Sequence, residues 1–129
     1  DGAYALAATA GATLAPNDGA NAFVDAMNIR ADELNLHNTT FRNPTGLDIS
    51  KNEAGSLSTA KETAFLMEYV LLTYPELLAA TTKDQARIYD QTGSYYDVAN
   101  TNQYLNQIPN ILGSKTGYTD LAGGNYFCA

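Results

Sequence analysis

The triplet Lys115-Thr116-Gly117 is the clearest candidate for chemistry in this sequence. It places a cation, a hydroxyl group and a residue without a side chain on a segment expected to be a strand. The 129 residues carry seven Lys plus Arg and 14 Asp plus Glu, a net charge of −7, so a cationic strand fits a local site for a small anion. Such a triplet also occurs on ordinary solvated strands that end in a turn, and by itself it does not separate the two interpretations.

Ser58 is the only serine that is followed by a lysine three positions later, at Lys61. This spacing matches a serine nucleophile and its lysine in acyl-transfer enzymes. The pair falls at the start of a predicted helix, where Ser58 and Thr59 have a capping role instead, so we assign no catalytic role to Ser58.

His37, the single histidine, lies in a polar loop and is interpreted as a surface residue rather than a metal ligand or a base. The sequence therefore predicts no catalytic residue and no metal site of its own.

Several other conspicuous side chains have structural interpretations. Acidic residues on the second predicted helix form its solvated face; these are Asp25, Asp32 and Glu33. Tyrosines in a predicted hairpin pack across the strands instead of stacking on nucleic-acid bases; these are Tyr89, Tyr95 and Tyr96. Cys128 is expected to be a small buried strand residue, not a reactive thiol.

The elements that must position these residues begin with helices. Residues 1–10 are alanine-rich and favour a helix that stops near Gly11. A second helix is predicted over residues 21–36 from an apolar stripe at helical spacing; the stripe is Phe23, Met27, Ala31 and Leu34. A turn at residues 43–46 follows. Thr59 and Glu62 then form a capping-box pattern before a helix that ends near residue 73, and Pro75 can start a short further helix.

Later residues carry strand signals. Residues 86–90 and 95–99 flank a turn at 91–94 and predict a hairpin. Residues 100–106 are expected to be irregular or briefly helical. The triplet lies on a predicted strand at 111–118, and after a turn at 119–124 its antiparallel partner follows at 125–129. Helices first and strands later favour an α+β fold, with residues 1 to about 80 helical and about 82–129 strand-rich within one partial domain, 1–129.

Composition excludes several classes of function. A hydrophobic fraction of 45% permits a buried core, and the absence of a basic block argues against nucleic-acid binding. No stretch approaches the roughly 20 apolar residues of a membrane span. The sequence opens without Met or a basic leader, and its last residues read as a strand without a following turn. We therefore expect a chain trimmed at both ends.

Six segments then match one family in order. The string at residues 113–123, Gly-Ser-Lys-Thr-Gly-Tyr-Thr-Asp-Leu-Ala-Gly, resembles the third motif of the low-molecular-mass penicillin-binding D-alanyl-D-alanine carboxypeptidases. Residues 22–28, 38–48 and 58–64 resemble further family segments, with Glu62 where the family usually has Asp. Residues 100–102 resemble an Asn-x-Asn element, and residues 1–7 resemble the stretch that follows the family's Ser-x-Asn motif. The resemblance spans nearly the whole chain.

The resemblance implies a helical subdomain plus part of the antiparallel sheet of the β-lactamase/transpeptidase-like fold. It implies a serine-type hydrolase that removes terminal D-Ala from peptidoglycan stem peptides through an acyl-enzyme, without a cofactor and outside the cytoplasm, in the bacterial cell envelope. Its partners would be stem peptides ending in D-Ala-D-Ala and, for the intact parent, β-lactam antibiotics.

The resemblance also gives residue roles in substrate binding. Lys115 supplies positive charge near the terminal carboxylate, and Thr116 hydrogen-bonds that carboxylate. Gly117 allows the substrate to lie antiparallel along the strand edge. The backbone N–H of Tyr118 is one oxyanion donor.

The main departure from the family is the missing nucleophile. No Ser-x-x-Lys is present outside the helix start at Ser58, and the family's Ser-x-Asn motif is expected to lie just before residue 1, so the isolated chain is expected to be inactive. Three alternatives stay open: a nucleophile-free binding module derived from this fold, a fragment of a serine β-lactamase, and an α+β domain of another role.

Overall fold

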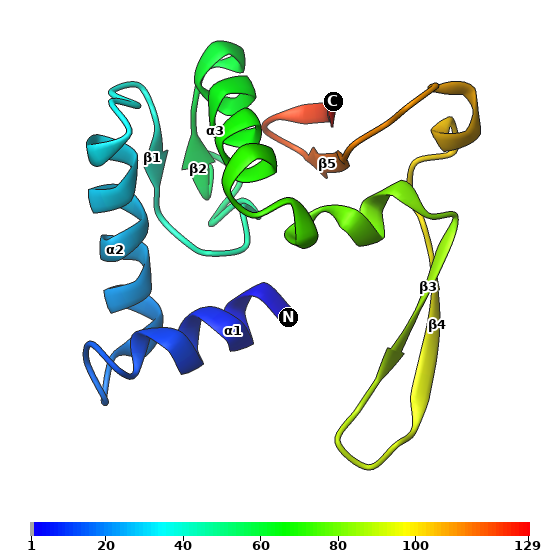
Figure 1. Cartoon of the computed structure of the whole chain (residues 1–129). Coiled ribbons are helices and arrows are strands. Elements are labelled where there is room, and N and C mark those ends of the chain that lie inside the picture. Colours follow the sequence, from blue (N-terminus) through cyan, green and yellow to red (C-terminus); the bar gives the residue numbers. More distant parts are fainter. Residues whose placement is uncertain (1) are drawn as a thin grey trace. The chain divides into compact units, whose positions relative to one another are not determined.

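The computed structural model describes residues 2–129, which form two compact units (Figure 1). Unit 1 contains the described residues up to Thr63 together with Thr119–Gly123. Unit 2 contains Ala64–Tyr118 and Gly124–Ala129. Helices precede most of the strands, as expected for an α+β chain, and the assignment of all residues to one partial domain stays a prediction.

Unit 1 is built around helix α1 (Gly2–Gly11) and helix α2 (Gly19–Glu33). Both helices were predicted, and on α2 the expected apolar stripe turns inward: Ala31 is buried and Phe23, Met27 and Leu34 are partly buried. The acidic residues Asp25, Asp32 and Glu33 are exposed, as predicted.

The end of α2 differs from its predicted end at residue 36. Asn35 adopts the left-handed conformation with a φ of 57°, and the N–H of Leu34 bonds to the carbonyl of Arg30. A residue in this conformation just after a helix is a common stop signal. The helix therefore ends at Glu33, and Leu36 is buried beyond it.

Strands β1 (Thr40–Phe41) and β2 (Ser56–Leu57) pair antiparallel in unit 1 and were not predicted. The side chain of Asn28 on α2 holds β1 in place. Its Oδ1 accepts the N–H of Phe41 at 2.8 Å, and its Nδ2 donates to the Phe41 carbonyl at 2.8 Å. One amide side chain thus pairs with the backbone of Phe41 and fixes β1 against the helix.

Helix α3 (Ala60–Thr73) begins in unit 1 and continues in unit 2. The hydroxyl of Thr59 accepts the N–H of Glu62 at 3.2 Å, which is the predicted N-cap bond. The Glu62 carboxylate accepts hydrogen bonds from Asn38 and Thr39, which were not predicted.

Unit 2 continues with two short 3₁₀ helices, η1 (Pro75–Leu77) and η2 (Ala79–Thr82). The predicted hairpin follows as β3 (Gln85–Tyr89) and β4 (Tyr95–Ala99), paired antiparallel. Tyr89 and Tyr95 pack across the strands as predicted, with their ring centroids 6.1 Å apart. A third 3₁₀ helix, η3 (Leu105–Gln107), occupies part of the segment expected to be irregular or briefly helical.

Strands β5 (Ser114–Thr119) and β6 (Gly123–Cys128) form the sheet that carries the triplet. β5 begins three residues later than predicted. Asn110 has a positive φ of 57°, and the N–H groups of Leu112 and Gly113 share the carbonyl of Ala129, so regular strand pairing begins only at Ser114. Reciprocal bonds between Gly113 and Ala129 close the far end of the hairpin.

The interpretation of Cys128 as a buried residue is wrong, because its side chain is exposed. Among the described residues, the sheet containing β6 has two strands, β5 and β6. No helix in the described part of the chain is both long and apolar enough to cross a bilayer.

Candidate functional site

The triplet lies on an open strand. Lys115 is exposed, and its ammonium donates to the carbonyl of Thr116. Thr116 is partly buried. A Cβ added to Gly117 would meet nothing within 4 Å, and Tyr118 is 72% exposed. Among the described residues β5 pairs with β6 alone, which leaves the other edge of β5 unpaired, and the space next to Gly117 is open.

A hollow of about 330 Å³ lies beside β5, and we call it the Thr116 hollow. Its wall combines a loop with both strands of the β5–β6 sheet; the lining residues are Thr101, Asn102, Gln103, Tyr104, Thr116 and Tyr126. Of the four predicted substrate-binding residues, only Thr116 lines it. Lys115, Gly117 and Tyr118 lie on the same strand but outside this wall.

Thr116 contacts the loop directly. Its Oγ1 lies 2.7 Å from the Oγ1 of Thr101, a normal O–H···O distance in which either hydroxyl can donate. The Asn-x-Asn string at residues 100–102 is visible in the sequence, but nothing in the sequence assigns a role to its middle residue. The structure brings that residue to the triplet across 15 positions of sequence.

Two asparagines hold the loop on either side of Thr101. Asn100 donates from Nδ2 to the carbonyls of Thr81 and Lys83, each at 2.9 Å. Asn102 is buried, at 7% exposure. Its Nδ2 donates to the hydroxyl of Tyr126 at 3.0 Å. This arrangement explains why amide side chains occupy both outer positions: each satisfies groups that lie outside the loop itself.

Thr81 connects the loop to the start of β5. Its carbonyl accepts from Asn100, and its Oγ1 accepts the N–H of Ser114 at 3.0 Å. Ser114 is buried, and its hydroxyl donates to the Thr81 carbonyl at 3.4 Å. The strand and the loop are therefore attached to one residue of η2. Thr81 was not predicted as part of the site, since a threonine in a short 3₁₀ segment carries no distinctive sequence pattern.

The chemistry of Tyr126 follows from its surroundings. Loss of solvation, and to a smaller extent a hydrogen bond with Cys128, raises the pKa of the Tyr126 hydroxyl. The phenol therefore remains a neutral hydrogen-bonding group at neutral pH and adds no negative charge to the Thr116 hollow.

A second polar cluster lies in unit 1 around Glu62. The carboxylate accepts from the N–H and Nδ2 of Asn38, the latter at 2.7 Å, and from the hydroxyl of Thr39 at 2.6 Å. The hydrogen bond from Thr39, more than those from Asn38, holds the pKa of Glu62 below its usual value, while desolvation opposes this shift. Ser58 belongs to the same cluster, with its Oγ 2.8 Å from the Thr39 hydroxyl and 3.2 Å from that of Thr63. These contacts agree with a role for Ser58 in anchoring the start of α3.

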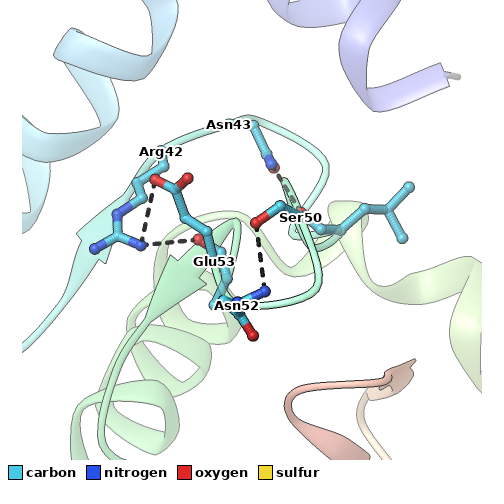
Figure 2. A network of polar contacts seen from close by, with 7 residues as sticks. Arg42, Asn43, Ser50, Asn52 and Glu53 are labelled. Atoms are coloured by element: carbon cyan, nitrogen blue, oxygen red, sulfur yellow. Dashed lines mark hydrogen bonds and ion pairs between the residues drawn. The ribbon is translucent and has the colours of Figure 1, made fainter.

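The loop between β1 and β2 is ordered by its own polar contacts (Figure 2). Asn43 makes the predicted turn: its Oδ1 accepts the N–H of Gly46 at 2.8 Å, and Gly46 has a φ of 72°. Figure 2 shows the side chains of Arg42 and Glu53 pointing toward one another, with a closest separation of 3.9 Å. Gly55 is buried against the turn, and a Cβ there would lie 2.1 Å from the Leu47 carbonyl oxygen.

Within residues 2–129, no group of three or more His, Cys, Asp or Glu side chains is placed to hold a metal ion. His37 is exposed.

A family model described as D-alanyl-D-alanine carboxypeptidase matches residues 4–129. The chain belongs to this family. Among curated carboxypeptidase relatives, D-alanyl-D-alanine carboxypeptidase DacF of Bacillus subtilis strain 168 is 38% identical over 97 residues, which cover 75% of this chain and 24% of that protein. A D-alanyl-D-alanine endopeptidase of Pseudomonas aeruginosa is 36% identical over 118 residues, covering 88% of this chain and 36% of that protein.

Solved structures of carboxypeptidase-family and related proteins share the fold. A D-alanyl-D-alanine carboxypeptidase from Mycobacterium tuberculosis H37Rv gives a TM-score of 0.70 at 27% identity, covering 91% of this chain and 43% of that one. A mutant Streptomyces DD-transpeptidase gives 0.73 at 25% identity, covering 95% of this chain and 47% of that one. These similarities confirm the expected penicillin-binding, transpeptidase-like fold. The chain spans about a quarter to a third of the length of the curated relatives it matches.

Proposed function

We propose that this chain forms the substrate-binding wall of a serine-type D-Ala-D-Ala carboxypeptidase that acts in peptidoglycan synthesis and remodelling. One observation carries the proposal beyond family membership. The Thr116 hydroxyl lies on the wall of a hollow, next to an exposed cation at Lys115 and an unobstructed backbone at Gly117. A hydroxyl donor, a cation and an open strand edge are what a peptide with a free terminal carboxylate requires.

In the proposed reaction, a serine attacks the carbonyl carbon of the penultimate D-Ala. The peptide bond breaks, the terminal D-Ala leaves as its amine after gaining a proton, and water hydrolyses the acyl-enzyme. Lys115 supplies positive charge near the terminal carboxylate, and Thr116 donates a hydrogen bond to it. Gly117 admits the peptide backbone beside β5, and the N–H of Tyr118 donates to the oxyanion. The bound partner is a peptidoglycan stem peptide, and the intact enzyme also takes β-lactams in the cell envelope.

The isolated chain is proposed to bind but not to cleave. Its Ser-x-x-Lys spacing at Ser58 lies in the cluster that anchors α3, where the Ser58 hydroxyl contacts Thr39 and Thr63. Incubation with a fluorescent penicillin, read by gel and intact mass, should leave the 129-residue chain unlabelled. Covalent labelling that disappears in Ser58→Ala would overturn this assignment.

Substrate binding can be tested with a diacetylated lysyl-D-alanyl-D-alanine tripeptide by NMR titration. Lys115→Ala should weaken binding by about two- to five-fold, the range of an exposed ion pair, and the loss should shrink at high salt. Lys83→Ala is the matched control, because Lys83 is another exposed lysine of unit 2. Equal losses in the two variants would contradict a specific role for Lys115.

The absence of a second Ser-x-x-Lys also supports an alternative, a nucleophile-free binding module derived from this fold. A fragment of a serine β-lactamase is a further enzyme alternative. The full-length encoded protein separates the three: release of D-Ala from the tripeptide supports the carboxypeptidase, preferential turnover of β-lactams supports the β-lactamase, and neither activity supports the binding module.

A further inference from the structure

We propose that Thr101 is a positioning residue for carboxylate recognition, whose hydroxyl donates to Thr116 and thereby directs the Thr116 proton toward the ligand. The inference rests on the proposed function, since it takes Thr116 as the donor to the terminal carboxylate. It adds a residue that neither the triplet nor the other family segments assign to substrate binding.

The hydroxyl groups of Thr101 and Thr116 together have one proton left to donate to a ligand. The two hydroxyl oxygens lie 2.7 Å apart, and each hydroxyl has one proton. One of the two protons must lie between the oxygens to form this bond. The pair therefore offers one remaining proton, either from Thr101 or from Thr116.

A bound carboxylate selects between these two arrangements. An ionised carboxylate only accepts hydrogen bonds, so Thr116 must donate its proton to it. The Thr116 oxygen then accepts the proton of Thr101, which gives a continuous chain from Thr101 through Thr116 to the carboxylate. Hydrogen bonds in such a chain polarise and strengthen one another. Without the Thr101 hydroxyl, no hydrogen bond from residue 101 fixes the rotation of the Thr116 hydroxyl. The Thr116 oxygen then also lacks the donor that polarises it.

The surrounding structure keeps Thr101 in place for this role. Asn100 on one side donates to two carbonyls, and the buried Asn102 on the other side donates to Tyr126. The N–H of Asn102 also bonds to the Oδ1 of Asn100 at 2.9 Å, which closes the loop around Thr101. Thr81 joins this loop to the beginning of β5. These bonds hold the loop next to β5, where the Thr101 and Thr116 hydroxyls meet.

The test compares peptide acids with peptide amides. The ¹⁵N-labelled 129-residue chain is titrated with the diacetylated tripeptide and with the same peptide amidated at its C-terminus. Thr101→Val keeps the branched shape and removes the hydroxyl. We expect it to weaken binding of the acid by about three- to ten-fold, the size of one lost hydrogen bond, and to leave binding of the amide nearly unchanged.

Conservative variants separate the hydroxyl from packing. Thr101→Ser should bind the acid like the wild type, and Thr101→Ala should bind it like the valine variant. This pair differs by one oxygen, so it decides the question even if the valine variant folds poorly. Thr116→Val should lose about ten-fold or more, because it removes the donor to a charged group.

The outcomes distinguish the inference from the function on which it rests. If the wild type binds acid and amide equally or binds neither, carboxylate recognition at Thr116 is wrong and the inference falls with it. If the wild type prefers the acid but Thr101→Ala binds as tightly as Thr101→Ser, the proposed function stands and the role of Thr101 is wrong. Equal loss of acid and amide binding in the alanine variant would also overturn it, because only packing would then be affected.

Discussion

Replacing Gly11 with alanine tests the close contact between α1 and α2. A Cβ at Gly11 would lie 1.8 Å from the carbonyl oxygen of Gly19 and 3.1 Å from the Cβ of Phe23. Real Cβ atoms essentially never approach closer than 3.0 Å, so the backbones must separate by at least about 1.2 Å (3.0 − 1.8). The obstacle at Gly19 is main chain, which has no rotamer to change.

Two effects of opposite sign decide the outcome. Alanine in place of glycine favours a helix by up to about 1 kcal/mol. Against this, overpacking a close contact typically costs about 1–3 kcal/mol. Moving two packed surfaces apart by about 0.5–1 Å also loses about a quarter to a half of the van der Waals attraction between their atoms. Because the required movement exceeds that gap, we place the cost at the upper end and expect a net destabilisation of about 2 kcal/mol.

The assay is urea unfolding followed by far-UV circular dichroism, with the free energy of unfolding obtained by linear extrapolation. Gly2→Ala is the matched control, because it lies on the same helix and a Cβ there meets nothing within 4 Å. The control should be as stable as the wild type or slightly more so. A Gly11→Ala variant that matched or exceeded the wild type in stability would refute the close approach of the two helices.

Three further predictions concern polar contacts. Hydrogen bonds from Thr39 and Asn38 lower the pKa of Glu62. The stability that this carboxylate contributes is therefore present above its usual pKa of 4.5 and is lost as pH falls through the lower folded value. Glu62→Gln should remove this pH-dependent loss of stability from the acid-unfolding curve measured by circular dichroism. Asp97→Asn disrupts an exposed cross-strand ion pair and should leave the free energy of unfolding almost unchanged, with faster amide exchange confined to the β3–β4 hairpin. Asp48→Ala removes the acceptor 3.1 Å from the Leu121 N–H, and that amide should exchange with solvent about ten-fold faster, whereas an unchanged rate would show that the bond contributes nothing.

Periodic signals made the long elements predictable. The apolar stripe of α2 and the turn chemistry between β3 and β4 follow from side chains a few positions apart, and both elements were found. The pair β1–β2 was missed, because two strands of two residues leave no alternation to detect. Asn28 helps to hold it through side-chain bonds to Phe41, which lies 13 residues away.

The candidate site was predicted only in its local part. The triplet and the Asn-x-Asn string were visible as patterns, but the bond that joins Thr101 to Thr116 depends on where the chain returns after 15 residues. The partners of the Glu62 carboxylate were missed for a similar reason. Glu62 has the right spacing to reach back to Thr59, yet distant donors at Asn38 and Thr39 compete for its carboxylate. Local sequence shows which bonds a side chain can make, and tertiary structure decides among them.

The position of Glu62 has a consequence for the order of folding. Its bonds to Asn38 and Thr39 span 24 and 23 residues, so they form only after the chain between them has closed into a loop that contains β1 and β2. Closing such a loop lowers the conformational entropy of the chain, and contacts between residues close in sequence do not offset that loss. The first turn of α3 and the small sheet should therefore be acquired together in a late step, and amide exchange near residue 62 should report opening of the whole loop and not fraying of a helix end.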